Sequence, residues 1–316
     1  MINFFKKKKE PERIRITDFI YNYISRTRYG KVYKRRYRNI CRHIEDFSKK
    51  TGIVLYFDNF TAGKAEEFIY YLKSEGRLKD KNKGTELMNN TVKGIWESVK
   101  SILNKAKNQK IEINLDVLEI NIKREDANAV YLTLEELNRL NSLKLTPSAA
   151  AVRDRFLVGC FTALRFSDYS QLTKENIIGN NIEIKTRKTG IKVIIPIHPI
   201  IYEILKRNNG DFPNIKSEVA FNKVVKTICK KAGINTNILY ERTIGLRVVR
   251  KMVKKYELVS SHTARRSGAT NMYLAGIPTA RIMLLTGHTT EQSFFRYIRI
   301  GKEENARTLA EFDFFK

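Results

Sequence analysis

Apolar residues recur at steps of three and four along the first part of the chain, a spacing that predicts amphipathic helices. The longest such stretch is residues 17–50. Residues 62–76 and 90–109 predict a second and a third helix, and the polar, glycine-containing segment between them predicts a loop. The apolar stripe of the longest stretch consists of Tyr33, Tyr37, Ile40, Ile44 and Phe47.

The helical period is lost after the third predicted helix, where the chain also becomes polar. A new helix start follows, because Thr133 precedes Glu136 by three residues, which is the spacing of a capping box. We therefore expect a helical first domain over residues 1–115, a linker over residues 116–129 and a second domain over residues 130–316.

The second half of the chain changes its pattern twice. Residues 153–173 are mostly apolar at first and polar at the end, which predicts a buried helix followed by a turn. Residues 181–197 predict two strands joined at Lys188, Thr189 and Gly190. From there to the end of the chain the pattern favours helices. The expected fold class is mainly α with a small antiparallel β-sheet.

Charge is the feature of the composition that departs most from an ordinary globular protein. Sixty Lys and Arg residues stand against 33 Asp and Glu, which gives a net charge of +27. Such an excess predicts a polyanionic partner, either nucleic acid or an anionic membrane surface. Four cations fall away from the apolar stripe and form either phosphate contacts or an ordinary solvated face: Lys34, Arg35, Arg38 and Arg42.

Other composition signals narrow the class of protein. No run of 18 apolar residues is present, so we expect no membrane-spanning helix. The basic run at residues 6–9 does not resemble a signal peptide and could be a short arm that contacts DNA. The three cysteines are far apart and lack metal-ligand spacing, which predicts a reducing compartment, no disulfide framework and no zinc site: Cys41, Cys160 and Cys229.

The segment "GHTTEQSFFRYI" places a tyrosine, Tyr297, nine residues after His288 and next to Arg296. A phenol is a poor nucleophile at neutral pH because its pKa is near 10. Positive charge around the group that it attacks would change that. Arg165 and Arg265 could supply this charge to a phosphodiester, because two guanidinium groups can clamp the non-bridging oxygens of a phosphate.

Three further residues fit the same chemistry. Lys188, on a hairpin beside other cations, could protonate the leaving 5′ oxygen. His262, on one helix face with Arg265, and His288 could donate hydrogen bonds to the phosphate or accept the phenol proton. Taken singly, each of these residues has an ordinary structural explanation as a cap, a turn residue, a surface pair or part of the core. Their joint order along the chain favours the chemistry.

At this point the sequence resembles the tyrosine recombinase, or phage integrase, family. That family orders its site as Arg, Lys, His-x-x-Arg, His or Trp, and Tyr. The resemblance is strong over residues 130–300 and weaker over residues 17–110, which resemble the family's SAM-like helical core-binding domain. Some motifs also resemble integrases of Bacteroides-type mobile elements. The matching segments are "ALRFSD", "RKTGIKVIIPI", "HTARRSGAT" and "LTGHTTEQSFFRYI".

The resemblance implies a role for each site residue. Arg165 and Arg265 would bind the scissile phosphate, Lys188 would protonate the 5′ hydroxyl, and Tyr297 would form a 3′-phosphotyrosine. His262 and His288 would assist these transfers. Asp168 matches the acidic position that buttresses the site. The sequence departs from the family pattern at two neighbouring positions, Arg266 and Gly268, which lie outside the core set.

The family also implies partners. It works on double-stranded DNA without a metal or other cofactor, as a homotetramer on two synapsed sites. A host factor or an excisionase would be a possible further partner, and the setting would be the cytoplasm of a bacterium or of a phage-infected cell. A C-terminal segment of each subunit docks on a neighbour. Residues that could dock in this way, or else pack on their own chain, are Leu309, Phe312, Phe314 and Phe315.

Several functions use this chemistry or this charge. The leading one is site-specific DNA strand exchange, leading to integration, excision or inversion of a DNA element. The little sequence before residue 17 favours a two-domain recombinase. Relaxation of DNA in the manner of a type IB topoisomerase and a non-catalytic DNA-binding regulator are the alternatives. A membrane-surface protein would explain the charge and leave the motif order unexplained.

Overall fold

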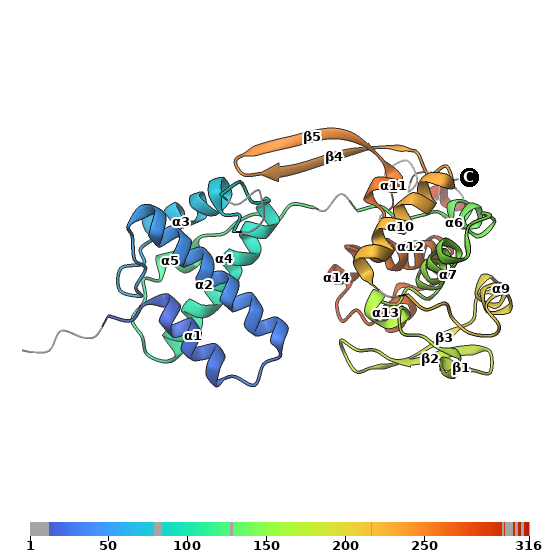
Figure 1. The fold of residues 1–316 in the computed structure, drawn as a ribbon, viewed down its shortest axis with the longest axis horizontal. Coiled ribbons are helices and arrows are strands. Elements are labelled where there is room, and N and C mark those ends of the chain that lie inside the picture. Colours follow the sequence, from blue (N-terminus) through green and yellow to red (C-terminus); the bar gives the residue numbers. More distant parts are fainter. Residues whose placement is uncertain are drawn as a thin grey trace, which may run out of the picture. The chain divides into compact units, whose positions relative to one another are not determined.

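The computed structural model describes residues 13–78, 84–126, 129–215, 217–298, 300, 306, 309–310 and 313–315. Contacts divide the chain into two compact units. The first unit consists of Met1–Ala127 with Glu241–Lys251, and the second of Asn128–Tyr240 with Met252–Lys316. The basic run at residues 6–9 lies outside the described part of the chain. Figure 1 shows a mainly α fold with small antiparallel sheets, the fold class that the sequence predicts.

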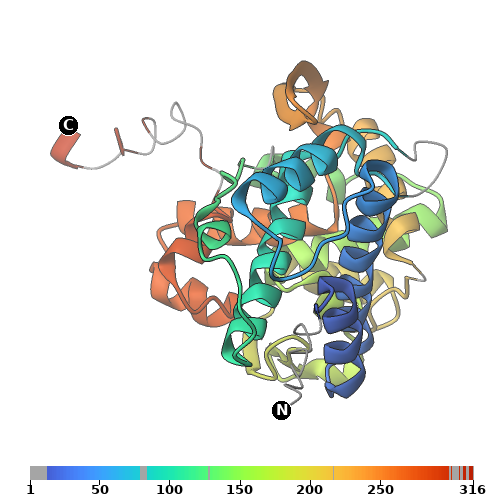
Figure 2. The same ribbon diagram turned by 90° about the vertical axis from the view of Figure 1, so that its left-hand side faces the viewer.

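Helices make up most of the first unit, and Figures 1 and 2 show α1 beside α2 from two directions. The sequence predicts helix throughout residues 17–50, and this is wrong between residues 26 and 31. There Thr27 and Gly30 are extended, and Gly30 is the N-cap of a separate helix, a position that glycine tolerates well. The described helices of this unit are α1 (Ile16–Arg26), α2 (Lys31–Thr51), α3 (Ala62–Glu75), α4 (Asn89–Asn108) and α5 (Asp116–Glu119).

The core of the first unit is aromatic and aliphatic, with Trp96 at full burial. Its indole N–H donates to the Ile120 carbonyl oxygen at 2.8 Å. Val117 and Ile122 are also buried in this core. The segment in which the sequence loses its helical period therefore contains the short helix α5 and packs on the first unit.

The second unit begins with the predicted capping box. The Thr133 hydroxyl accepts from the Glu136 N–H at 3.2 Å, and the Glu136 carboxylate accepts from the Thr133 N–H at 2.9 Å. The described helices that follow are α6 (Leu134–Asn141), α7 (Pro147–Thr162), α8 (Phe166–Tyr169), η1 (Lys174–Asn176), α9 (Pro199–Arg207), α10 (Glu218–Lys231), α11 (Lys255–Leu258), α12 (Ser261–Leu274), α13 (Thr279–Thr286), α14 (Glu291–Phe295) and η2 (Asp313–Phe315).

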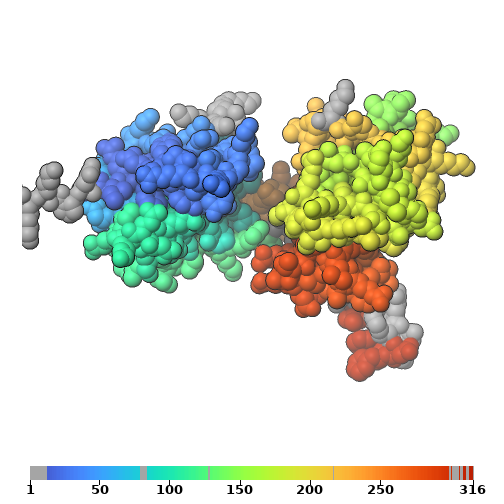
Figure 3. Space-filling view, turned by 90° about the horizontal axis from the view of Figure 1, so that it is seen from below, coloured from blue at the N-terminus to red at the C-terminus, as the bar shows by residue number. Residues whose placement is uncertain are grey.

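A three-stranded antiparallel sheet lies within this unit, in the order β1 (Ile177–Ile178), β2 (Asn181–Lys185) and β3 (Lys192–Pro196). Residue pairs such as Ile182 with Ile195 set the register of β2 against β3. Both of these residues are buried in the core of the unit. Strand β3 contacts α13, and Figure 3 shows the yellow-green surface of the sheet region next to the orange-red surface of the last helices. The sequence predicts β2 and β3 with their connecting turn.

A second hairpin contradicts the expectation that the chain stays helical after residue 197. Strands β4 (Asn237–Ile244) and β5 (Arg247–Lys254) pair through a two-residue turn at Gly245 and Leu246. Gly245 has φ +63°, a conformation that suits glycine at the first position of such turns. Charged and β-branched residues are mixed along both strands, and this pattern fits an exposed ribbon better than a helix.

The tip of this hairpin belongs to the first unit. The Gly245 N–H donates to the Leu87 carbonyl oxygen at 2.9 Å, and Met88 and Ile244 form an isolated β-bridge. The Arg247 guanidinium donates to the Glu86 carboxylate at 2.9 Å. Residues 241–251 therefore complete a unit that is otherwise built from the N-terminal part of the chain.

Helices α7 and α12 pack together in the core of the second unit. A Cβ atom added to Gly268 would lie 2.5 Å from the Cys160 carbonyl oxygen and 2.8 Å from the Ala163 Cβ. Only glycine allows an approach this close, because the obstructing oxygen belongs to the backbone. The absent side chain at Gly268 brings α12 against the end of α7. Within the described residues, no helix is both long and apolar enough to cross a membrane.

Candidate active site

Two helix ends meet around one arginine in the second unit. Helix α7 ends at Ala163 with φ +52°, and helix α13 ends at Gly287 with φ +63°. The last carbonyl groups of a helix lack partners within the helix and carry partial negative charge. The guanidinium of Arg265, from α12, donates to the Ala163 carbonyl oxygen at 3.0 Å and to the Thr286 carbonyl oxygen.

Arg265 is buried, with 2% of its surface exposed. Burial first, and then the charge of Arg165, lower its pKa to about 10, so the group still carries its charge at neutral pH. Its Nε–H has no hydrogen-bond partner among the described residues. A charged donor held in place and left unpaired can bind an anion without further rearrangement.

His288 lies directly beside this guanidinium. Its Nε2 is 3.4 Å from the terminal nitrogen of Arg265, and its Nδ1 is 2.8 Å from the Thr286 hydroxyl oxygen. Burial, followed by the charges of Arg265 and Arg165, lowers the pKa of His288 to about 4. The imidazole is therefore neutral at neutral pH and can accept a proton.

Tyr297 completes the cluster from the segment after α14. Its ring centroid is 4.7 Å from that of His288, and the guanidinium carbon of Arg265 is 5.3 Å from the same tyrosine centroid. The backbone holds it there, because the Tyr297 N–H donates to the Phe294 carbonyl oxygen at 2.7 Å. Its own carbonyl oxygen accepts from the Thr270 hydroxyl at 3.4 Å. A phenol in this position has a proton acceptor and a cation as neighbours.

Arg165 and Asp168 bound the cluster on the side of α8. Arg165 is the N-cap residue of α8, and its charge lowers the pKa values of His262, Arg265 and His288. A Cβ atom built on Gly287 would lie 3.9 Å from an Arg165 guanidinium nitrogen, so the two loops adjoin. Asp168 is 1% exposed, and its second carboxylate oxygen has no partner among the described residues.

His262 stands in the first turn of α12, three residues before Arg265. Partial burial first, then the charge of Arg266, lower its pKa, although the residue as a whole is classed as exposed. His262 is therefore a neutral imidazole with one side open to solvent. That side could face a bound phosphate.

Lys188 is the predicted site residue that the structure does not bring to the others. It lies exposed in the turn between β2 and β3, and no hydrogen bond or ion pair of the described residues joins it to the cluster. Its neighbour supplies an indirect connection, since the Arg187 N–H donates to the Asp168 carboxylate at 2.9 Å. The foot of the turn is thus fixed to the site, while the lysine itself is free to swing.

Sequence reasoning did not single out Thr286 or Ala163, although their carbonyl groups hold Arg265. Thr286 could have been found from its place directly before Gly287 and His288, where a helix ends. Ala163 carries no such signal, because alanine rarely adopts positive φ.

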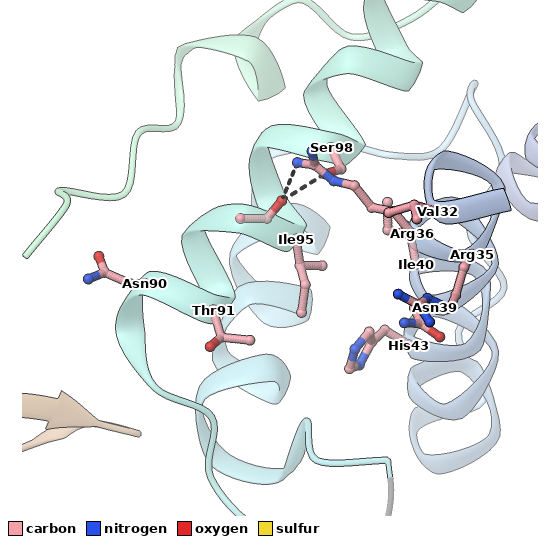
Figure 4. A pocket seen from close by; sticks show the side chains of 11 residues that line it. Val32, Arg35, Arg36, Asn39, Ile40, His43, Asn90, Thr91, Ile95 and Ser98 are labelled. Carbon is pink, nitrogen blue, oxygen red and sulfur yellow. Dashed lines mark hydrogen bonds between the residues drawn. The ribbon is translucent and has the colours of Figure 1, made fainter. Parts of the chain in front are cut away.

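The basic face predicted in the first unit lies on α2. Arg35, Arg38 and Arg42 are exposed and Lys34 is half-buried. Beside them runs a groove of about 480 Å³ between α2 and α4, which Arg36 crosses to donate to the Ser98 hydroxyl at 2.7 Å (Figure 4). The groove is lined by Val32, Arg35, Arg36, Asn39, Ile40, His43, Asn90, Thr91, Gly94, Ile95 and Ser98.

Metal-ligating and thiol groups form no site in the described part of the chain. No cluster of three or more histidine, cysteine or acidic side chains there could hold a metal ion. The three cysteines are free and buried: Cys41, Cys160 and Cys229.

Comparisons with known proteins agree with this arrangement. Residues 130–304 match the family model described as phage integrase family, and residues 15–118 match the phage integrase SAM-like domain. The search of curated proteins finds no match.

Solved structures share the fold at low sequence identity. A fragment of the Tn1549 transposon integrase in complex with circular intermediate DNA is 15% identical, with a TM-score of 0.61 over 95% of this chain and 100% of that one. A lambda integrase fragment, a dimer bound to a COC′ core site, is 14% identical, with a TM-score of 0.62 over 90% and 96% of the two chains. A lambda integrase tetramer bound to a Holliday junction is 13% identical, with a TM-score of 0.59 over 87% and 76%.

Proposed function

This chain belongs to the phage integrase family of tyrosine recombinases, and from that premise we propose that it cuts and rejoins DNA at a specific site through a 3′-phosphotyrosine at Tyr297. The observation that carries the proposal is the position of the Tyr297 ring, 4.7 Å from a neutral histidine ring and 5.3 Å from a buried guanidinium. Base and cation are the two groups that a phenol needs to attack a phosphodiester.

In the proposed cleavage step, the Tyr297 oxygen bonds to phosphorus while the bond from phosphorus to the 5′ oxygen breaks. The phenol proton passes to a neutral imidazole, with His288 as the nearer candidate. Arg165 and Arg265 stabilise the charge that builds on the non-bridging oxygens. Lys188 swings in on its turn and gives a proton to the leaving 5′ oxygen. Rejoining is the reverse, with a 5′ hydroxyl of the partner strand as the nucleophile.

We assign the remaining binding work to the first unit. Its match to the SAM-like domain and the exposed cations of α2 support contact with DNA phosphates. We also propose a homotetramer on two synapsed DNA sites, with a host factor or an excisionase as a further partner in one direction of the reaction. The proposed C-terminal docking segment falls largely outside the described residues, including Phe312. Phe314, which is described, is 90% exposed and suits a docking role.

Covalent trapping tests this function. The full chain is incubated with labelled DNA from the two ends of its own genetic element, and adducts that resist SDS are separated on a gel. We expect an adduct with the wild type and with Tyr273→Phe, a matched control whose half-buried ring packs against Phe295. We expect none with Tyr297→Phe, which should still bind DNA.

Other outcomes point elsewhere. An adduct that persists in Tyr297→Phe contradicts the assignment of the nucleophile. Tight binding by the wild type without any adduct favours a non-catalytic regulator. Relaxation of any supercoiled plasmid, with no preference for a site, favours the activity of a type IB topoisomerase.

A further inference from the structure

Hydrogen bonds around Thr286 determine which nitrogen of His288 carries the proton. The Thr286 hydroxyl oxygen lies 2.7 Å from the Ile282 carbonyl oxygen, one turn earlier in α13. A carbonyl oxygen can only accept, so the single hydroxyl proton points to Ile282. The same hydroxyl oxygen is 2.8 Å from the His288 Nδ1 and must accept there. This assigns the proton to Nδ1.

The other face of the imidazole gives the same answer independently. The His288 Nε2 lies 3.4 Å from a guanidinium nitrogen of Arg265, and a guanidinium can only donate. A hydrogen on Nε2 would point at these donors. The tautomer with a bare Nε2 is therefore favoured from both sides of the ring.

We propose that Thr286 is a positioning residue, whose hydroxyl holds His288 in the Nδ1–H tautomer so that the Nε2 lone pair can accept the phenol proton of Tyr297. The inference deepens the proposed function and depends on it for the identity of the nucleophile. Thr286 would then act twice, since its carbonyl oxygen also holds Arg265. One residue at the end of α13 sets the direction of both the base and the cation.

The proton balance of the step follows from this tautomer. The phenol proton moves to Nε2, and the resulting imidazolium keeps its Nδ1–H bond to Thr286. When the strand is rejoined, the proton returns to Tyr297. The groups that face His288 are Arg165 and Arg265, which oppose its protonation, and Tyr297. A bound phosphate would offset the two cations and make Nε2 a stronger base when DNA is in place.

The first test measures the tautomer in the free full-length protein. Long-range ¹H–¹⁵N spectra of histidine-labelled protein at neutral pH distinguish a protonated from a bare ring nitrogen, and His288→Gln assigns the signals. We expect the Nδ1–H form in the wild type and in Thr286→Ser, and a growing share of the Nε2–H form in Thr286→Val. Thr162→Val removes a similar hydroxyl-to-carbonyl bond, to Val158 at the end of α7, and should leave the His288 signals unchanged.

The second test measures the rate of adduct formation as a function of pH. Thr286→Val should be about 10-fold slower near neutral pH, because part of the protein holds the wrong tautomer, and Thr286→Ser should recover most of the rate. Wild-type spectra with the proton on Nε2, or a Thr286→Val variant with unchanged spectra and rate, would overturn the proposal. If no adduct forms in any variant, the proposed function fails, while the spectra still decide the tautomer.

Discussion

Arg265 shows how a side chain stays charged inside the protein. Two carbonyl groups at helix ends and the lone pair of His288 accept from its guanidinium. Hydrogen bonds to a charged group contribute about 1.5–3 kcal/mol each, and losing one partner leaves the charge uncompensated. The same contacts point its unpaired Nε–H in a fixed direction. The arginine is therefore oriented before any DNA arrives.

The role of Lys188 can be tested with a chemically altered leaving group. Lys188→Ala should slow cleavage by about 10²–10⁴-fold, since the 5′ oxygen would leave without a proton. A substrate with sulfur in place of that bridging oxygen should restore the rate, because a thiolate leaves without protonation. Lys185→Ala, at the exposed end of β2 in the same hairpin, is the matched control and should cleave both substrates normally.

A different pattern would remove Lys188 from the reaction. If Lys188→Ala is slow on both substrates to the same extent, the lysine acts in binding or folding. If it is as fast as the wild type, another group supplies the proton.

Motif order in the sequence predicts several residues that the structure brings together, namely Arg165, Arg265, His288 and Tyr297. It could not predict how they are held. The supporting contacts come from backbone carbonyl groups, such as that of Ala163, and these have no residue signature. The position of Lys188 in the reaction also stays a prediction, because its turn is exposed and separate from the cluster.

At the scale of elements, the crossing of α7 and α12 sets the distance between the phosphate-binding residues. Arg165 follows the end of α7, and Arg265 lies one turn before Gly268 on α12. A side chain at Gly268 would push the two helices apart. The family-pattern departure at this position thus has a local explanation in close helix packing.

Gly268→Ala should reduce the free energy of unfolding by about 1–3 kcal/mol, because the new methyl group meets a backbone oxygen that cannot turn away. Gly94→Ala is the control, since a Cβ at that helical position meets nothing within 4 Å. It should be neutral or stabilising by up to about 1 kcal/mol. Chemical denaturation of the full chain measures both, and equal stability of the two variants would contradict the packing argument.

Elements with a clear period are predictable from this sequence, and elements without one are not. The apolar stripe locates the long helices α2 and α4, and the capping box locates the start of α6. Strands β4 and β5 were missed because most of their residues are exposed or half-buried, so no buried face imposes a strict alternation. The break after α1 was missed because the stripe resumes in phase four residues later.

At the scale of the whole molecule, the charge of +27 determines how binding responds to salt. Each phosphate contact releases counterions, so the logarithm of affinity should fall steeply and linearly with the logarithm of salt concentration. Arg38→Gln, on the exposed face of α2, should lower the steepness by about one unit. Arg13→Gln should leave it unchanged, because Arg13 is paired with Asp58 at 2.7 Å.

Fluorescence anisotropy with a labelled duplex at several salt concentrations gives these slopes. A flat salt profile would show that the basic face contributes little to binding. Equal effects of the two substitutions would show that overall charge matters and that the face on α2 does not.

The central claim is that Tyr297 becomes bonded to a 3′ phosphate of DNA. The most direct measurement is mass spectrometry of the protease-digested adduct, combined with chemical identification of the DNA end that stays free. The account predicts a nucleotide on the peptide that contains Tyr297 and a free 5′ hydroxyl on the other DNA end. A nucleotide on any other residue, or a protein bonded to the 5′ phosphate, would contradict it.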